Sequence, residues 1–125
     1  MTENEIAKVI VDAAFKVHVK LGPGLLESVY ESVLAYELEK RGLKVTRQQA
    51  IPVVYEQVNL AEGFRADIIV ESKVIIELKS VEAVHPVHKK QLLTYLILAN
   101  KRLGLLINFG ALLIKDGISR VVNNL

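Results

Sequence analysis

The spacing of apolar residues changes near Gly42, and this change is the feature that most constrains the fold. Before Gly42, apolar residues recur every three or four positions over residues 3–20 and 25–41, which predicts two amphipathic helices. The sequence Leu21-Gly22-Pro23-Gly24 separates them, because two glycines and a proline do not readily continue a helix. We therefore expect two helices that pack their apolar faces on one core.

After Gly42 the sequence consists mostly of short segments rich in β-branched residues. Strands are predicted for residues 44–48, 51–55, 63–70 and 74–78, with turns near Gln49, between 56 and 62, and at 71–73. Pro86 suits the first turn of a third helix, predicted to run to residue 100. A buried strand is predicted for residues 103–109, and a short strand or hairpin for 112–122. The order α-α-β-β-β-β-α-β-β predicts a single α/β domain over residues 1–125, built around a mixed sheet.

Composition narrows the class of protein. A chain of 125 residues can bury one core, and the absence of cysteine argues against disulfides and thiolate metal sites, so we expect a cytoplasmic protein. The N-terminus does not resemble a signal peptide, and no apolar run approaches the ~20 residues that span a bilayer. The net charge is only +2, yet residues 79–125 carry seven basic and two acidic residues. This basic third is compatible with a polyanionic partner, and equally with a solvated face.

Charged residues interrupt the apolar segment 64–79, which is predicted to form a hairpin. Successive side chains point to opposite faces of a strand, so Glu77 and Lys79 share one face. If Ser72 is the centre of the turn, Asp67 lies opposite Glu77 on that same face. A shift of one residue would move Asp67 to the other face. The turn therefore decides whether these charges form one cluster.

Two carboxylates opposite each other on a hairpin lie only ~5 Å apart at Cβ and should repel. A divalent cation makes the pair favourable, since Mg²⁺ binds one or two carboxylates together with water and phosphate oxygens. Asp67 and Glu77 are therefore the candidate ligands for Mg²⁺, with Mn²⁺ as a substitute. Lys79 could orient an attacking water and offset phosphate charge, which predicts metal-assisted phosphodiester hydrolysis. The alternative is a solvated face on which Lys79 pairs with Glu77 or Asp67.

Two predicted helices add polar residues. Glu27 lies near the start of the second helix, beside its apolar stripe, where a carboxylate is costly unless it is used. It is otherwise a favourable acid at the positive end of the helix dipole. On the third helix His88, Gln91 and Tyr95 share one face and could position a phosphate or a base. Residues of these types are also common at the edge of a core.

These residues resemble the pattern of the PD-(D/E)XK nuclease superfamily: an Asp on one strand, Glu-x-Lys on the next, a Glu on a preceding helix and Gln-x-x-x-Tyr on a following one. More closely, the chain is similar to the GxxExxY protein family, a small bacterial and archaeal group within that superfamily. The resemblance covers almost the whole chain. Its motifs, in the family's order, are Gly22-Pro-Gly-Leu-Leu-Glu-Ser-Val-Tyr30, Ile51-Pro-Val-Val-Tyr55, Phe64-Arg-Ala-Asp67, Ile76-Glu-Leu-Lys79, Gln91-Leu-Leu-Thr-Tyr95 and Leu103-Gly-Leu-Leu-Ile-Asn-Phe109.

The resemblance implies a restriction-endonuclease-like α/β/α sandwich with a central mixed sheet. It also implies a catalytic set of four residues and a substrate side formed by the third helix. The catalytic set is Glu27, Asp67, Glu77 and Lys79, of which the three acids would serve the metal ion. The substrate side would include Gln91 and Tyr95.

A basic cluster opens the third predicted helix, where Lys89 and Lys90 follow His85 and His88. It predicts a phosphate contact, although solvated lysines are common at a helix start.

The leading hypothesis is a Mg²⁺-dependent nuclease, with DNA and RNA both open as substrates. The alternatives are a non-catalytic module that binds nucleic acid or protein, and a structural subunit of a larger assembly. The apolar composition also favours a homodimer, the commonest symmetric assembly.

Overall fold

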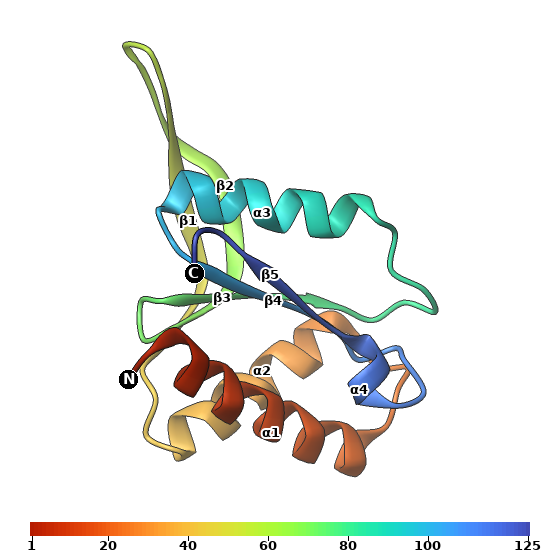
Figure 1. Cartoon of the computed structure of the whole chain (residues 1–125). Coiled ribbons are helices and arrows are strands. Elements are labelled where there is room, and N and C mark those ends of the chain that lie inside the picture. The colour runs from red at the N-terminus through yellow and green to blue at the C-terminus, as the bar shows by residue number, and fades with distance from the viewer.

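The computed structural model describes all 125 residues as five strands and four helices (Figure 1). In chain order these are α1 (Glu3–Leu21), α2 (Glu27–Lys40), β1 (Val45–Tyr55), β2 (Val58–Val70), β3 (Val74–Lys79), α3 (Val87–Ala99), β4 (Leu103–Asn108), α4 (Ile114–Gly117) and β5 (Ile118–Val122). The strands form one sheet in the order β1-β2-β3-β4-β5. Only β3 and β4 pair in parallel, and α3 connects them.

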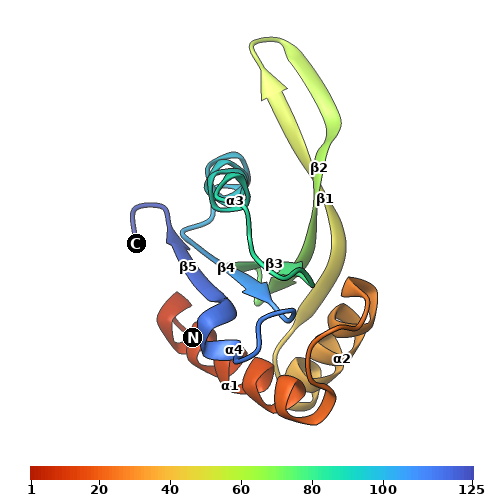
Figure 2. The same ribbon diagram turned by 90° about the vertical axis from the view of Figure 1, so that its right-hand side faces the viewer.

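Helices cover both faces of the sheet, with α1 and α2 on one side and α3 on the other (Figures 1 and 2). The larger core lies under α1 and α2, and the smaller one lies between α3 and the opposite face of the sheet. Alternation along β2 and β3 divides their side chains accordingly: Ile68 and Ile76 face α1 and α2, whereas Ile69 and Ile75 face α3. This three-layered α/β/α arrangement around a mixed sheet confirms the expected fold class.

The helical pair forms as the apolar spacing predicts. A capping box at Thr2 and Glu5 begins α1, and Gly22 and Gly24, with φ of 69° and 101°, allow the chain to reverse toward α2. Leu26 lies in the segment 25–41 with helical apolar spacing, yet it is 73% exposed at the N-cap position of α2. The helix instead buries the side chains of Tyr30, Glu31, Leu34, Ala35, Glu37 and Leu38.

The predicted turn near Gln49 is wrong, because the two strands expected on either side of it form the continuous strand β1. Gln48 has a left-handed backbone with φ of 49°, yet pairing with β2 continues on both sides of it. Strand β2 also begins earlier than expected, at Val58, so β1 and β2 form a long hairpin. Its tip extends beyond the rest of the molecule (Figure 2).

The C-terminal segment agrees with expectation in part. Of the two alternatives for residues 112–122, the short strand forms as β5, but the single helical turn α4 precedes it and no hairpin is present. Strand β5 pairs antiparallel with β4 and forms one edge of the sheet. No helix of the chain is both long enough and apolar enough to cross a bilayer.

Candidate functional site

The β2–β3 hairpin turns at Ser72, as predicted. Ile68 pairs with Ile76 and Val70 with Val74, a register whose centre is Ser72. Continued by one residue, the same register places Asp67 opposite Glu77. By alternation with Ile75, Glu77 points to the face that α3 covers. At Asp67 the alternation along β2 is interrupted, because Ala66 and Ile69 both pack on the α3 face.

Hydrogen bonds between side chain and backbone join Asp67 and Glu77 where the β2–β3 ladder ends. The backbone N–H of Leu78 donates to Asp67 Oδ2 at 2.8 Å. The backbone N–H of Asp67 donates to Glu77 Oε1 at 3.3 Å. The two carboxylates thus take the place of ladder carbonyls as acceptors, which satisfies N–H groups that would otherwise lack partners.

The pKa of Glu77 reflects its burial beside Asp67. Burial, and next the negative charge of Asp67, raise the pKa of Glu77 to about 8. The hydrogen bond from the Asp67 N–H and the positive charge of Lys79 act in the opposite direction but do not compensate. A carboxyl group so disfavoured as an anion is a typical member of a functional site. It is also a group whose charged form a bound cation would stabilise.

Lys79 ends β3 on the same face as Glu77, and its positive charge partly opposes the rise in the pKa of Glu77. None of the five ion pairs in the structure includes Lys79. The solvated pair that the alternative interpretation expects, Lys79 with Glu77 or Asp67, is therefore not formed. The ammonium group is available to a water molecule or a phosphate.

The end of β3 is held by the buried side chain of Asn108. Its Oδ1 accepts the N–H groups of Val81 and Gly110 at 3.0 Å, and its Nδ2 donates to the Val81 carbonyl at 2.9 Å. In the parallel register Asn108 lies beside Lys79. This amide thus fixes the chain immediately after the Glu-x-Lys motif.

Tyr95 is the residue of α3 that the structure links to the two carboxylates. Burial, followed by the charges of Glu77 and Asp67, raises the pKa of Tyr95. The ring of Tyr95 stacks on Phe64 of β2, with centroids 3.9 Å apart. Gln91 lies one helical turn earlier and is exposed.

The predicted basic cluster lies at the start of α3, on the same helix as Tyr95 and Gln91. Lys89 and Lys90 are exposed and make no ion pair. His88 is half-buried, and its Nδ1 has no hydrogen-bond partner. The ring of His85 lies at a right-angled orientation to it, with centroids 6.4 Å apart.

Glu27 occupies the first position of α2 and is exposed. The preceding loop reaches the end of β3, where the Ser80 hydroxyl donates to the Leu25 carbonyl at 2.5 Å. The buried side chain of Tyr30 holds that loop in place. Its hydroxyl donates to the Gly22 carbonyl at 2.5 Å and accepts the Leu25 N–H at 3.2 Å. The start of α2 therefore lies near the residue that follows Lys79.

Sequence reasoning missed a second helical glutamate, Glu31. It is buried, and Arg47 donates to its Oε2 at 3.0 and 3.1 Å. Gln48 donates to Glu31 Oε1 at 2.5 Å and to Asp67 Oδ1 at 3.3 Å, which connects α2 to the site. Helical spacing could have revealed this residue, because it places Glu31 on the same face of α2 as the buried Leu34, Ala35 and Leu38.

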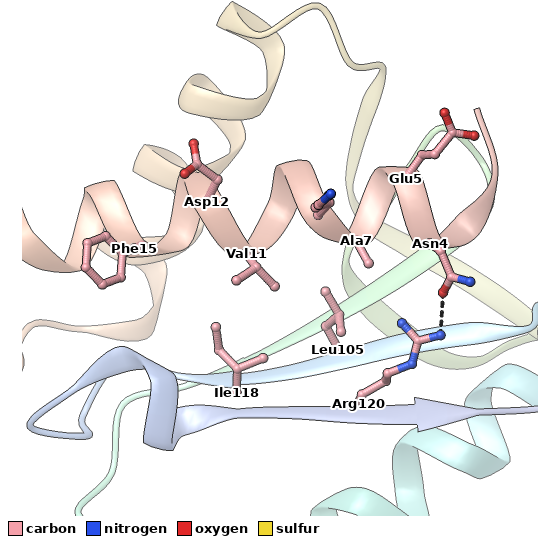
Figure 3. A pocket seen from close by; sticks show the side chains of 10 residues that line it. Asn4, Glu5, Ala7, Val11, Asp12, Phe15, Leu105, Ile118 and Arg120 are labelled. Carbon is pink, nitrogen blue, oxygen red and sulfur yellow. Dashed lines mark hydrogen bonds between the residues drawn. The ribbon is translucent and has the colours of Figure 1, made fainter.

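A groove of about 940 Å³ lies elsewhere, between α1 and β5 (Figure 3). Its apolar floor includes Val11, Leu105 and Ile118, and Arg120 donates a hydrogen bond to Asn4 across it. None of the residues that line it belongs to the predicted site. Glu77 points to the other face of the sheet, so this groove is separate from the carboxylate pair.

Asp67 and Glu77 are the residues whose chemistry suits a small hard cation. Mg²⁺ commonly binds one or two carboxylates and keeps several waters, and these residues supply two carboxylates opposite each other in the hairpin register. No three His, Asp or Glu side chains of the chain lie close enough together to hold one ion.

Comparison with protein families gives one match. The family model of the PD-(D/E)XK nuclease superfamily matches residues 4–121, nearly the whole chain. No curated protein and no solved structure matches the chain. The matched region contains every residue of the predicted site.

Proposed function

Because the chain belongs to the PD-(D/E)XK nuclease superfamily, we propose that it is a Mg²⁺-dependent nuclease that hydrolyses phosphodiester bonds in nucleic acid. The observation that carries this proposal is the β2–β3 register, which continued by one residue sets Asp67 opposite Glu77, with Lys79 on the same face as Glu77. The raised pKa of Glu77 supports it, since burial and the charge of Asp67 disfavour the Glu77 anion, the form that a bound cation would stabilise.

Asp67 and Glu77 hold the metal ion in this proposal, with Mn²⁺ as a substitute for Mg²⁺. When bound, the ion supplies Lewis-acid stabilisation of the charge on the phosphate. Lys79 orients the attacking water and offsets negative charge on the scissile phosphate, a task that suits an ammonium group without an ion-pair partner. Glu27 supports the metal site from the start of α2, near the end of β3.

The face of α3 that carries Tyr95 forms the substrate side. The Tyr95 hydroxyl lies within the field of both carboxylates and could donate to a phosphate or base near them. Gln91 and His88 continue this face toward the start of the helix, where Lys89 and Lys90 add positive charge. Nucleic acid would then run along α3, with its scissile bond over the carboxylate pair.

A cleavage panel tests the proposal. Single- and double-stranded DNA and RNA are incubated with the protein and Mg²⁺ or Mn²⁺, and with the Asp67→Asn variant. Asp116→Asn is the matched control, because Asp116 is an exposed aspartate of α4. Cleavage of at least one substrate that requires metal and Asp67, but not Asp116, supports a nuclease. Binding of nucleic acid with no cleavage under any condition would favour the non-catalytic binding module.

The proposal also includes an oligomeric state, a cellular location and a subfamily. A homodimer is tested by size-exclusion chromatography with light scattering, and a cytoplasmic location by cell fractionation. Placement within the GxxExxY family rests on the motif formed by Gly24, Glu27 and Tyr30.

A further inference from the structure

Gln48 has an unusual backbone conformation in the middle of a strand. Its φ is 49°, in the left-handed region that residues other than glycine, asparagine and aspartate rarely adopt. Arg47 still pairs with Ile68, and Gln49 pairs with Ala66, so Gln48 lies opposite Asp67. Strained conformations of this kind persist where surrounding contacts enforce them, and they are frequent at functional sites.

The side chain of Gln48 supplies a reason for the conformation. Its amide nitrogen donates one hydrogen bond to Glu31 Oε1, at 2.5 Å, and a longer one to Asp67 Oδ1, at 3.3 Å. Carboxylates only accept hydrogen bonds when ionised, so the amide must present its nitrogen to both. One neutral side chain thereby bridges a carboxylate of α2 and a carboxylate of the site.

Other residues also hold Gln48 and its partner Glu31. Arg47 fixes the buried Glu31 carboxylate through its second oxygen, Oε2. The Gln48 backbone carbonyl accepts a hydrogen bond from Arg65 at 3.1 Å. The amide therefore approaches Asp67 from a fixed position.

The Asp67 carboxylate is consequently held at both oxygens, by Gln48 at Oδ1 and by the Leu78 N–H at Oδ2. Each oxygen keeps a lone pair for a further partner. We infer that Gln48 is a positioning residue that orients the Asp67 carboxylate for a divalent cation, and that Glu31 and Arg47 hold Gln48 in place. This inference rests on the proposed function.

The test measures Mn²⁺ affinity by titration calorimetry on metal-free protein, independently of cleavage. Gln48→Met keeps the length of the side chain but removes the donor, and Gln48→Asn tolerates a left-handed backbone but is too short to bridge. Residues that orient metal ligands typically contribute about 10- to 100-fold to metal affinity. We expect a loss of that size in both variants.

Gln49→Met is the matched control, because Gln49 is exposed and its side chain makes no hydrogen bond. It should bind Mn²⁺ as the wild type does. Thermal melting of each variant in EDTA provides the second readout. A merely structural role would lower the melting temperature and leave Mn²⁺ affinity unchanged.

Two other outcomes separate this inference from the function on which it rests. If the wild type binds Mn²⁺ through Asp67 and both Gln48 variants bind it equally well, the positioning role is overturned and the metal site stands. If the wild type and Asp67→Asn both fail to bind Mn²⁺, the metal site is overturned, and the positioning role with it.

Discussion

The Asp67 carboxylate accepts the backbone N–H of Leu78 at 2.8 Å, while the Glu77 carboxylate accepts the backbone N–H of Asp67 at 3.3 Å. Backbone hydrogen bonds thus hold the two acidic groups together. Burial, and next the charge of Asp67, disfavour the Glu77 anion and raise the pKa of Glu77 to about 8. Ionisation of Glu77 therefore costs stability, which a bound cation would offset.

The first prediction concerns pH. Because the folded-state pKa of Glu77 is about 8 against an ordinary value of 4.5, this group stabilises the fold fully below pH 4.5, and the contribution is lost as pH rises through 8. The free energy of unfolding in EDTA should fall over this range by up to ~1.4 kcal/mol per pH unit from this group. Glu77→Gln should remove the decline and be more stable than the wild type at pH 8.

Urea denaturation at pH 5, 6.5 and 8 measures this effect. Glu82→Gln serves as the control, since Glu82 is exposed and should leave the slope with pH unchanged. An unaltered slope in Glu77→Gln would contradict the raised pKa.

The second prediction concerns Asn108, whose amide makes three hydrogen bonds to Val81 and Gly110. Asn108→Ala leaves buried backbone groups without partners, a loss of about 1–3 kcal/mol for each group that stays unsatisfied. We expect a loss of at least ~2 kcal/mol in urea denaturation. Asn59→Ala, on the exposed part of the β1–β2 hairpin, should be neutral. Equal stability of the two variants would show that Asn108 does not hold the end of β3.

The third prediction concerns Tyr30, which is fully buried and bonds the loop before α2. Tyr30→Phe keeps the stacking on Phe109, at 4.4 Å between centroids, but removes the hydroxyl that bonds Gly22 and Leu25. Thermal or urea denaturation should show a loss of about 1–2 kcal/mol. Tyr36→Phe, at a residue that is 65% exposed, is the control and should change stability little. No difference between the two would mean that the hydroxyl is not needed to fix the loop before α2.

Periodicity predicted much of this structure because it reports burial directly. A turn centred on Ser72 was enough to set Asp67 opposite Glu77. Alternation along β2 holds only in part, because Ala66 and Ile69 both pack on the α3 face. The helical face that carries Tyr95 followed in the same way from a spacing of three to four residues.

The sequence-based predictions fail where tertiary contacts override the local conformational preference of the chain. The turn predicted near Gln49 does not form, and Glu31 and Arg65 instead hold Gln48 in a left-handed conformation within a continuous strand. Glu31 was missed because its partners, Arg47 and Gln48, lie 16 and 17 residues away in sequence. Spacing within one element carries no information on such distant partners.

The most direct test of the nuclease is cleavage by Lys79→Met, because Lys79 is assigned to the attacking water and not to the metal. The measurement is the Mg²⁺-dependent cleavage rate on the substrate that the wild type cuts best, with Lys115→Met as an exposed matched control. We predict a fall of about 100-fold or more in Lys79→Met, with Mn²⁺ affinity and the rate of the control unchanged. Equal cleavage by Lys79→Met and the wild type would contradict the account.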